Sequence, residues 1–166
     1  MLSCLVGSEM CIRDRYRRGG SFERIGDYET ADKDLLESLK ITRENPYVLN
    51  YLAYSWLERN YKIELSMEML KEAYDLRKND PYITDSLGWG YYLINDFENA
   101  EKYLKKAVEL MPYDPIVNDH YGDILWMLNR KIQARYFWNN VLNLDETDDE
   151  MKIDVKKKII YGIEKT

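Results

Sequence analysis

Residues 80–95 read DPYITDSLGWGYYLIN, and the same pattern occurs twice more in the chain. An earlier copy at 45–60 reads NPYVLNYLAYSWLERN, and a later copy at 114–129 reads DPIVNDHYGDILWMLN. The three copies align without gaps and begin 35 and then 34 residues apart. A fixed period of this length is typical of a repeat architecture in which each unit packs against its neighbours.

Small residues recur with the same period after each copy. One series is Ala31, Ser66, Ala100 and Ala134, and the other is Ser38, Ala73, Ala107 and Val141. Bulky apolar residues lie between them at helical rather than strand spacing, which predicts an amphipathic helix. Small side chains at fixed places in every unit predict that paired helices approach closely.

Each unit is predicted to contain two antiparallel helices. An Asn or Asp precedes a proline at 45–46, 80–81 and 114–115, as in a capped helix that begins with proline. Gly26, Asn95 and Asn129 mark the turn between the helices, because Gly and Asn adopt the left-handed conformation that ends a helix.

These residues resemble the tetratricopeptide repeat, a helical hairpin of the same length. The matching positions in the third unit are Leu87, Gly88, Tyr91, Phe97, Ala100, Leu104, Ala107 and Pro112. The resemblance implies an all-α fold, a right-handed α-solenoid of about three and a half to four stacked helix pairs. More narrowly, the chain resembles bacterial tetratricopeptide proteins that are often exported.

The resemblance divides the chain into an array at 16–148 and a C-terminal capping helix at 149–166. The expected units of the array are 16–45, 46–80, 81–114 and 115–146. In the capping helix we expect Ile153, Ile160 and Ile163 to form the inward stripe.

The first fifteen residues, MLSCLVGSEMCIRDR, lack the repeat pattern and resemble a translated sequencing adapter. We expect this segment to be foreign and not to pack as part of the first helix; the alternatives are a divergent native helix or a truncated signal segment. Both cysteines, Cys4 and Cys11, lie in it. The authentic N-terminus is then missing, so localisation stays open between the cytoplasm and export.

Charge and composition limit the classes of partner and reaction. The net charge of −6 and a pI near 5.0 argue against nucleic acid and anionic membranes, which attract clustered Lys and Arg. No apolar run is long enough to span a bilayer. No nucleophile–base pair, phosphate loop or metal-ligand pattern is visible, so we expect no enzyme, cofactor or metal. His120, the only histidine, is interpreted as a packed or hydrogen-bonded residue.

Residues four and seven apart share one face of each first helix, and this face is acidic and aromatic. In tetratricopeptide arrays the matching positions line the concave groove. The candidate groove residues are Asn50, Tyr54, Tyr82, Asp85, Trp89, Tyr92, Asp119, Asp123 and Trp126. Such a surface suits a basic or apolar-basic peptide, although the aromatic residues could instead pack between neighbouring repeats. By resemblance, the clamp for chaperone-tail carboxylates requires basic residues where this chain has acids.

We therefore expect a non-enzymatic scaffold that binds a protein or peptide in its groove. One alternative is a self-assembly module, in which a second copy fills the groove of a homo-oligomer. The other is an accessory domain of a larger enzyme whose N-terminal part is missing.

Overall fold

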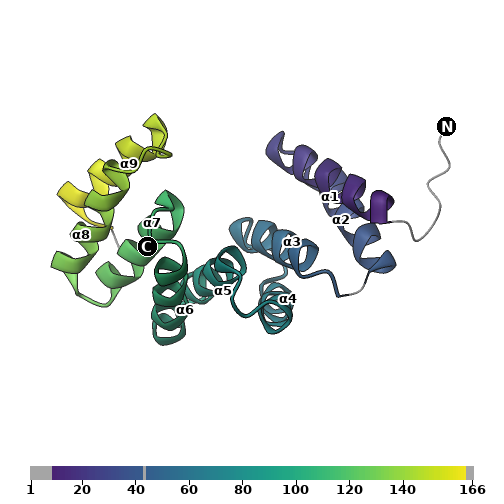
Figure 1. The fold of residues 1–166 in the computed structure, drawn as a ribbon, viewed down its shortest axis with the longest axis horizontal. Coiled ribbons are helices and arrows are strands. Elements are labelled where there is room, and N and C mark those ends of the chain that lie inside the picture. The colour runs from purple at the N-terminus through teal and green to yellow at the C-terminus, as the bar shows by residue number, and fades with distance from the viewer. Residues whose placement is uncertain (1–8, 43, 164–166) are drawn as a thin grey trace. The chain divides into compact units, whose positions relative to one another are not determined.

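The computed structural model describes residues 9–42 and 44–163, and these residues form nine α-helices and no strands (Figure 1). The helices are α1 (Glu9–Arg24), α2 (Tyr28–Ile41), α3 (Pro46–Glu58), α4 (Ile63–Leu76), α5 (Pro81–Leu93), α6 (Phe97–Leu110), α7 (Pro115–Met127), α8 (Lys131–Leu142) and α9 (Asp149–Tyr161). Four hairpins, α1–α2, α3–α4, α5–α6 and α7–α8, are followed by a single helix. This confirms the predicted all-α repeat fold.

The predicted caps begin α3, α5 and α7. The side chains of Asn45, Asp80 and Asp114 each accept a hydrogen bond from the backbone N–H three residues later, at 3.3, 3.1 and 3.0 Å. The proline that follows each cap occupies the first turn, where its missing N–H has no intrahelical partner to lose. Local sequence therefore sets where the first helix of each hairpin begins.

A left-handed residue follows the first helix of each hairpin. The φ angles are 80° at Gly26, 54° at Asn60, 63° at Asn95 and 61° at Asn129. The turn after α3 is irregular, because Lys62 also has a positive φ of 46°. Among the turns that the structure describes, this is the one in which two non-glycine residues take this unfavourable conformation.

Both series of small residues are buried at helix crossings. Two glycines on first helices extend the same principle. A Cβ atom at Gly88 would lie 2.7 Å from Leu104 Cγ, and one at Gly122 would lie 2.4 Å from Trp138 Nε1. Because neither position can hold a side chain, Leu104 of α6 and Trp138 of α8 pack directly against the backbone of the preceding helix.

The chain divides after Arg77 into two compact units. The first contains α1–α4, and its core includes Leu35, Leu52, Trp56 and Leu70. The second contains α5–α9, and its core is built around Leu104, Ile124, Leu125 and Trp138. Most of the candidate groove residues lie in the second unit, whereas Asn50 and Tyr54 belong to α3 of the first.

Part of the first fifteen residues is helical, contrary to our expectation. Helix α1 begins at Glu9 and runs without a break to Arg24, and Arg15 lies 3.8 Å from Asp34 of α2. Glu, Met and Arg favour helix, so an existing helix extends easily through this stretch. Residues 1–8, including Cys4, lie outside the described residues. The foreign origin of the segment stays a prediction.

The C-terminal helix forms as predicted, and Ile163 packs on the core as expected, but the other two residues assigned to the inward stripe are exposed. Ile153 is 56% exposed and Ile160 is 64% exposed, whereas Val155 is fully buried. Met151, Ile159 and Ile163 are the other residues of this region that pack on the core. The inward face thus follows 151, 155 and 159, which are one helical turn apart.

Candidate functional site

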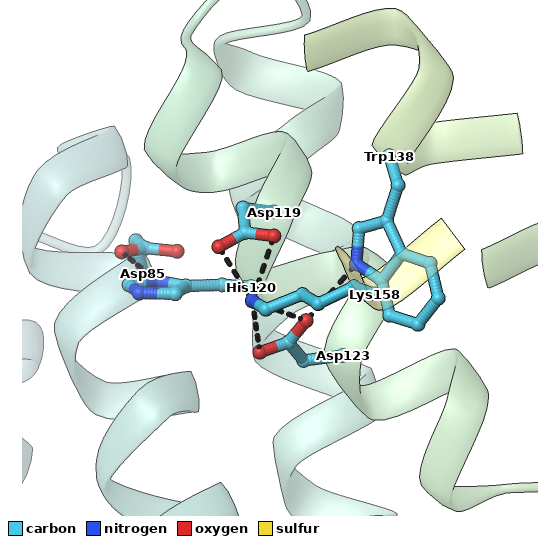
Figure 2. A network of polar contacts seen from close by, with 6 residues as sticks. All are labelled: Asp85, Asp119, His120, Asp123, Trp138 and Lys158. Carbon is cyan, nitrogen blue, oxygen red and sulfur yellow. Dashed lines mark hydrogen bonds and ion pairs between the residues drawn. The ribbon is translucent and has the colours of Figure 1, made fainter. Parts of the chain in front are cut away.

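A network of charged and aromatic side chains lies across the first helices of the second unit (Figure 2). Asp85 comes from α5, Asp119, His120 and Asp123 come from α7, and Lys158 comes from α9. We call these five residues the charged network. Because Asp119 and Asp123 are one helical turn apart, their carboxylates face the same way.

Lys158 is held by both carboxylates of α7. Its Nζ atom donates to the oxygens of Asp119 at 2.8 and 2.7 Å and lies 2.9 and 2.8 Å from those of Asp123. The side chains are 23% exposed for Lys158, 16% for Asp119 and 6% for Asp123. The ammonium group is therefore enclosed between two acids but not sealed from solvent.

Asp123 has a second donor, because Trp138 Nε1 donates to its Oδ1 atom at 3.0 Å. Burial, with the nearby Asp119 carboxylate, still raises the pKa of Asp123 to about 6, although Lys158 acts against this. For Lys158, burial lowers the pKa, but the attraction of Asp123 and Asp119 outweighs it and leaves the pKa above its ordinary value. One cation thus serves two acids in a largely buried site.

His120 reaches back from α7 to α5. Its Nδ1 atom lies 2.9 Å from Asp85 Oδ2, and both side chains are buried. Burial is the largest influence and lowers the pKa of His120, but Asp85, Asp123 and Asp119 together outweigh it, so the pKa is raised. The interpretation of His120 as a packed, hydrogen-bonded residue is confirmed.

The ring of Trp89 stacks between the rings of His120 and Tyr92. Trp89 lies 4.0 Å from the His120 ring at 12° and 4.5 Å from the Tyr92 ring at 10°, measured between ring centroids and planes. Trp89 and Tyr92 are both half-buried. Burial, with the charges of Asp123 and Asp119, raises the pKa of the Tyr92 hydroxyl to about 12. Tyr92 is therefore a neutral apolar surface with a hydroxyl at its edge.

The remaining candidate residues differ in accessibility. Tyr82 is 60% exposed, and Ile116, one repeat later, is 53% exposed. Trp126 is half-buried, and its Nε1 atom donates to the backbone oxygen of Ile163 at 3.1 Å. In the first unit, Asn50 and Tyr54 are half-buried on α3. The predicted face is therefore open at Tyr82 and Ile116 and covered by the C-terminal region at Trp126.

Sequence reasoning missed the partners of the acids. Asp85 pairs with His120 and the acids of α7 pair with Lys158, so these carboxylates also join successive first helices. Lys158 could have been found, because it lies seven residues after Met151 and three after Val155 and so shares their inward face. The incorrect stripe through Ile153 and Ile160 hid that position.

Among the described side chains, no group of three His, Cys, Asp or Glu residues could hold a metal ion. None of the helices in the described part is long and apolar enough to cross a membrane.

Residues 86–114 match the family described as tetratricopeptide repeat. Among curated proteins, the chain is similar to the TPR repeat-containing protein PA4667 of Pseudomonas aeruginosa, with 32% identity over 89 residues. The aligned part is 54% of this chain, and it spans 15% of the length of that relative.

Solved structures share the fold at low sequence identity. PilF of Pseudomonas aeruginosa has a TM-score of 0.69 at 18% identity, with 91% of this chain and 69% of that chain covered. MamA from Desulfovibrio magneticus RS-1 has a TM-score of 0.68 at 20% identity, covering 83% and 77%. The first TPR domain of Spaghetti (RPAP3), solved with the HSP90 peptide SRMEEVD, has a TM-score of 0.67 at 15% identity, covering 75% and 98%.

The helical hairpins and these matches define a solenoid of repeated units. The chain carries a match to the tetratricopeptide repeat at residues 86–114 and is similar in fold to proteins built from that repeat. Proteins built from this repeat are generally non-enzymatic scaffolds for protein–protein interaction.

Proposed function

We propose that this chain binds a protein or peptide segment on the first-helix face of α5 and α7, and that the segment presents basic and apolar side chains. The observation that carries the proposal is the ammonium group of Lys158 between Asp119 and Asp123. An ammonium group held in this way supports a preference of this face for basic side chains. Asp85 occupies the position one repeat before Asp119, so the face offers acids at corresponding places in consecutive units.

One carboxylate oxygen of Asp85 lacks a hydrogen-bond donor among the described residues. Its Oδ2 atom pairs with His120, whereas its Oδ1 atom is buried and has no hydrogen-bond partner among the residues that the structure describes. A buried carboxylate oxygen without a donor costs free energy, so it favours any partner that supplies one. A cationic or amide donor entering beside Trp89 would satisfy it.

The apolar part of the face complements these acids. Tyr82 and Ile116 are exposed at corresponding positions of α5 and α7, and the stacked rings of Trp89 and Tyr92 both lie on α5. Aromatic side chains supply contact area with few rotatable bonds, and their faces attract cations. A segment with a lysine or arginine next to an apolar residue would use both features.

A structural neighbour supports the mode of binding but not the same ligand. The RPAP3 domain was solved with the peptide SRMEEVD, whose C-terminal half is acidic. The face of the present chain carries Asp85, Asp119 and Asp123, so a similarly acidic peptide would be repelled. We therefore assign the opposite charge preference to this chain.

The proposal is tested with labelled peptides that share one apolar sequence and differ only in having lysine, glutamine or glutamate at fixed positions. Fluorescence anisotropy with the full chain should rank lysine first and glutamate last, and the difference should shrink as salt is raised. Equal affinity for all three peptides would contradict the charge preference, and no binding of any would contradict the proposed face.

Tyr82→Ala locates the site. Tyr82 is 60% exposed on α5, and Tyr136 is 63% exposed on α8, so Tyr136→Ala is the matched control on a second helix. We expect Tyr82→Ala to weaken the lysine peptide by roughly tenfold and Tyr136→Ala to leave it unchanged, because only the first is on the proposed face. Equal effects of both variants on peptide affinity would show that the binding site lies elsewhere.

A further inference from the structure

We propose that the C-terminal end of α9 is a displaceable occupant of the acidic site on α7, and that a lysine-bearing helical segment of a protein partner takes its place. The inference rests on the proposed function, since it concerns the same face. It adds the kind of partner for that site and the contact that regulates access to it.

The end of α9 contacts α7 and α8 largely through groups that any helix would supply. Trp126 Nε1 donates to the backbone oxygen of Ile163, and Arg135 Nε donates to the backbone oxygen of Ile159 at 2.9 Å. Neither bond depends on the identity of the residue that accepts it. A different helix end could therefore accept both.

Two residues of this segment are specific, one in the last turn of α9 and one just after the helix ends. Lys158 supplies the ammonium group, and Gly162, four residues later, packs on Trp126 so closely that a Cβ atom would lie 1.9 Å from its ring. Gly162 also has a φ of 79° and a ψ of −168°, a conformation that is essentially restricted to glycine. The partner that fits is therefore a helix ending in Lys-x-x-x-Gly.

α9 is held by fewer buried side chains than any other helix of the second unit. Within the described residues it contributes one buried side chain, Val155, whereas α5 contributes seven buried residues and α7 nine. Ile153, Ile160 and Tyr161 are exposed on its outer face. Because local opening is easiest where few buried contacts must break, α9 opens before the hairpins do.

Opening leaves the acids of α7 without their cation. Asp119 and Asp123 would then face each other with only the indole N–H of Trp138 donating to Asp123. Two neighbouring carboxylates without a counter-ion are unfavourable, so the open state favours another ammonium group. The partner's lysine and Lys158 thus compete for one site.

The test uses the full chain and a labelled synthetic peptide with the sequence of residues 148–163. The peptide must compete with the chain's own α9, so the apparent affinity is reduced by the fraction of chains in which the site is open. Gly162→Ala in the chain forces the end of α9 off Trp126 without changing Asp119 or Asp123. We expect this variant to bind the peptide on the order of tenfold or more tightly than the unchanged chain.

The matched control is the same peptide with Lys158→Met, which keeps length and apolar character but removes the ammonium group. We expect it to bind the Gly162→Ala chain at least about tenfold more weakly than the lysine peptide does. Equal binding of the two peptides would overturn the assignment of a lysine site.

Hydrogen exchange of the α9 amides shows whether the helix is displaceable. Val155→Ala serves as a second variant, because it weakens the buried anchor of α9 rather than its end. Faster exchange in either variant without tighter peptide binding would overturn the competition, and unchanged exchange in both would show that α9 is fixed. Neither result would alter the effect of Tyr82→Ala on peptides held at α5, so failure here is distinguishable from failure of the proposed function.

Discussion

The charged network places five titratable side chains in a largely buried site. Asp85, Asp119 and Asp123 face His120 and Lys158, so three acids share two bases. Folded-state pKa values are raised for Asp123, His120 and Lys158 alike, which means that the folded chain holds protons more tightly than the unfolded chain does. The network therefore links stability to pH.

The sign of that linkage is a testable expectation. The pKa of Asp123 rises from 3.8 to about 6 on folding, so its contribution to stability falls as pH rises through this window. His120 acts in the same direction above pH 6.5, because its folded-state pKa is also raised. In urea melts, Asp123→Asn should gain stability relative to the unchanged chain between pH 4 and 6, by up to about 3 kcal/mol.

The comparison with Asp123→Asn is needed because other acids act in the opposite sense. Glu37 and Asp154 lie beside lysines and have lowered pKa values, so their contributions are lost as pH falls. They cancel in the difference between the two chains. A difference that stays constant with pH would show that Asp123 is ionised as easily in the folded chain as in the unfolded one.

Among the elements, α9 is the one whose orientation the sequence does not determine. The hairpins have capping residues at the start of α3, α5 and α7, left-handed turn residues and buried small residues at fixed intervals, and each of these signals is local. α9 has a good cap at Asp148, but its apolar residues fall on more than one face. Its rotation depends on the shape of the α7–α8 surface, which no local pattern encodes.

The corrected stripe of α9 predicts unequal effects of truncating its apolar residues. Val155→Ala should lower the free energy of unfolding by roughly 1–3 kcal/mol, because the side chain is fully buried against the core. Ile160→Ala, a larger truncation at a 64% exposed site, should change it by less than about 0.5 kcal/mol. Urea melts of both variants measure these changes. A larger loss for Ile160→Ala than for Val155→Ala would show that the inward face passes through Ile160, as first expected.

Much of the candidate site follows the same division between local and non-local information. Spacing along a helix correctly brought Asp119 and Asp123 to one face and Asp85 to the equivalent place one repeat earlier. The pairing of Asp85 with His120 and of the α7 acids with Lys158 joins residues 35 or more positions apart. Such pairs depend on how one hairpin packs on the next, so periodicity alone could not predict them.

At the scale of the whole molecule, the first unit begins with a helix whose early part has few visible anchors. Arg13 and Asp14 are exposed, and Arg15 is half-buried with an ion pair to Asp34. Arg18 contacts the same carboxylate at 2.5 and 2.6 Å, so Asp34 keeps a partner if Arg15 is removed.

A chain that starts at Tyr16 should therefore melt within a few degrees of the full chain, because these described side chains bury little area. Calorimetry or circular dichroism provides the measurement. A loss of ten degrees or so, which corresponds to about 3 kcal/mol in a chain of this size, would show that the segment belongs to the first repeat.

The contact between Trp126 and the end of α9 gives the chain an optical reporter of its own. The indole N–H of Trp126 is bonded to Ile163, its ring lies against Gly162, and Lys131 and Arg135 approach the ring at 4.9 and 5.1 Å. Release of the helix end would wet this ring, and the emission of an indole shifts to longer wavelength when water reaches it. A partner that takes the place of α9 could thus be detected from the colour of the protein's own fluorescence, with no dye attached.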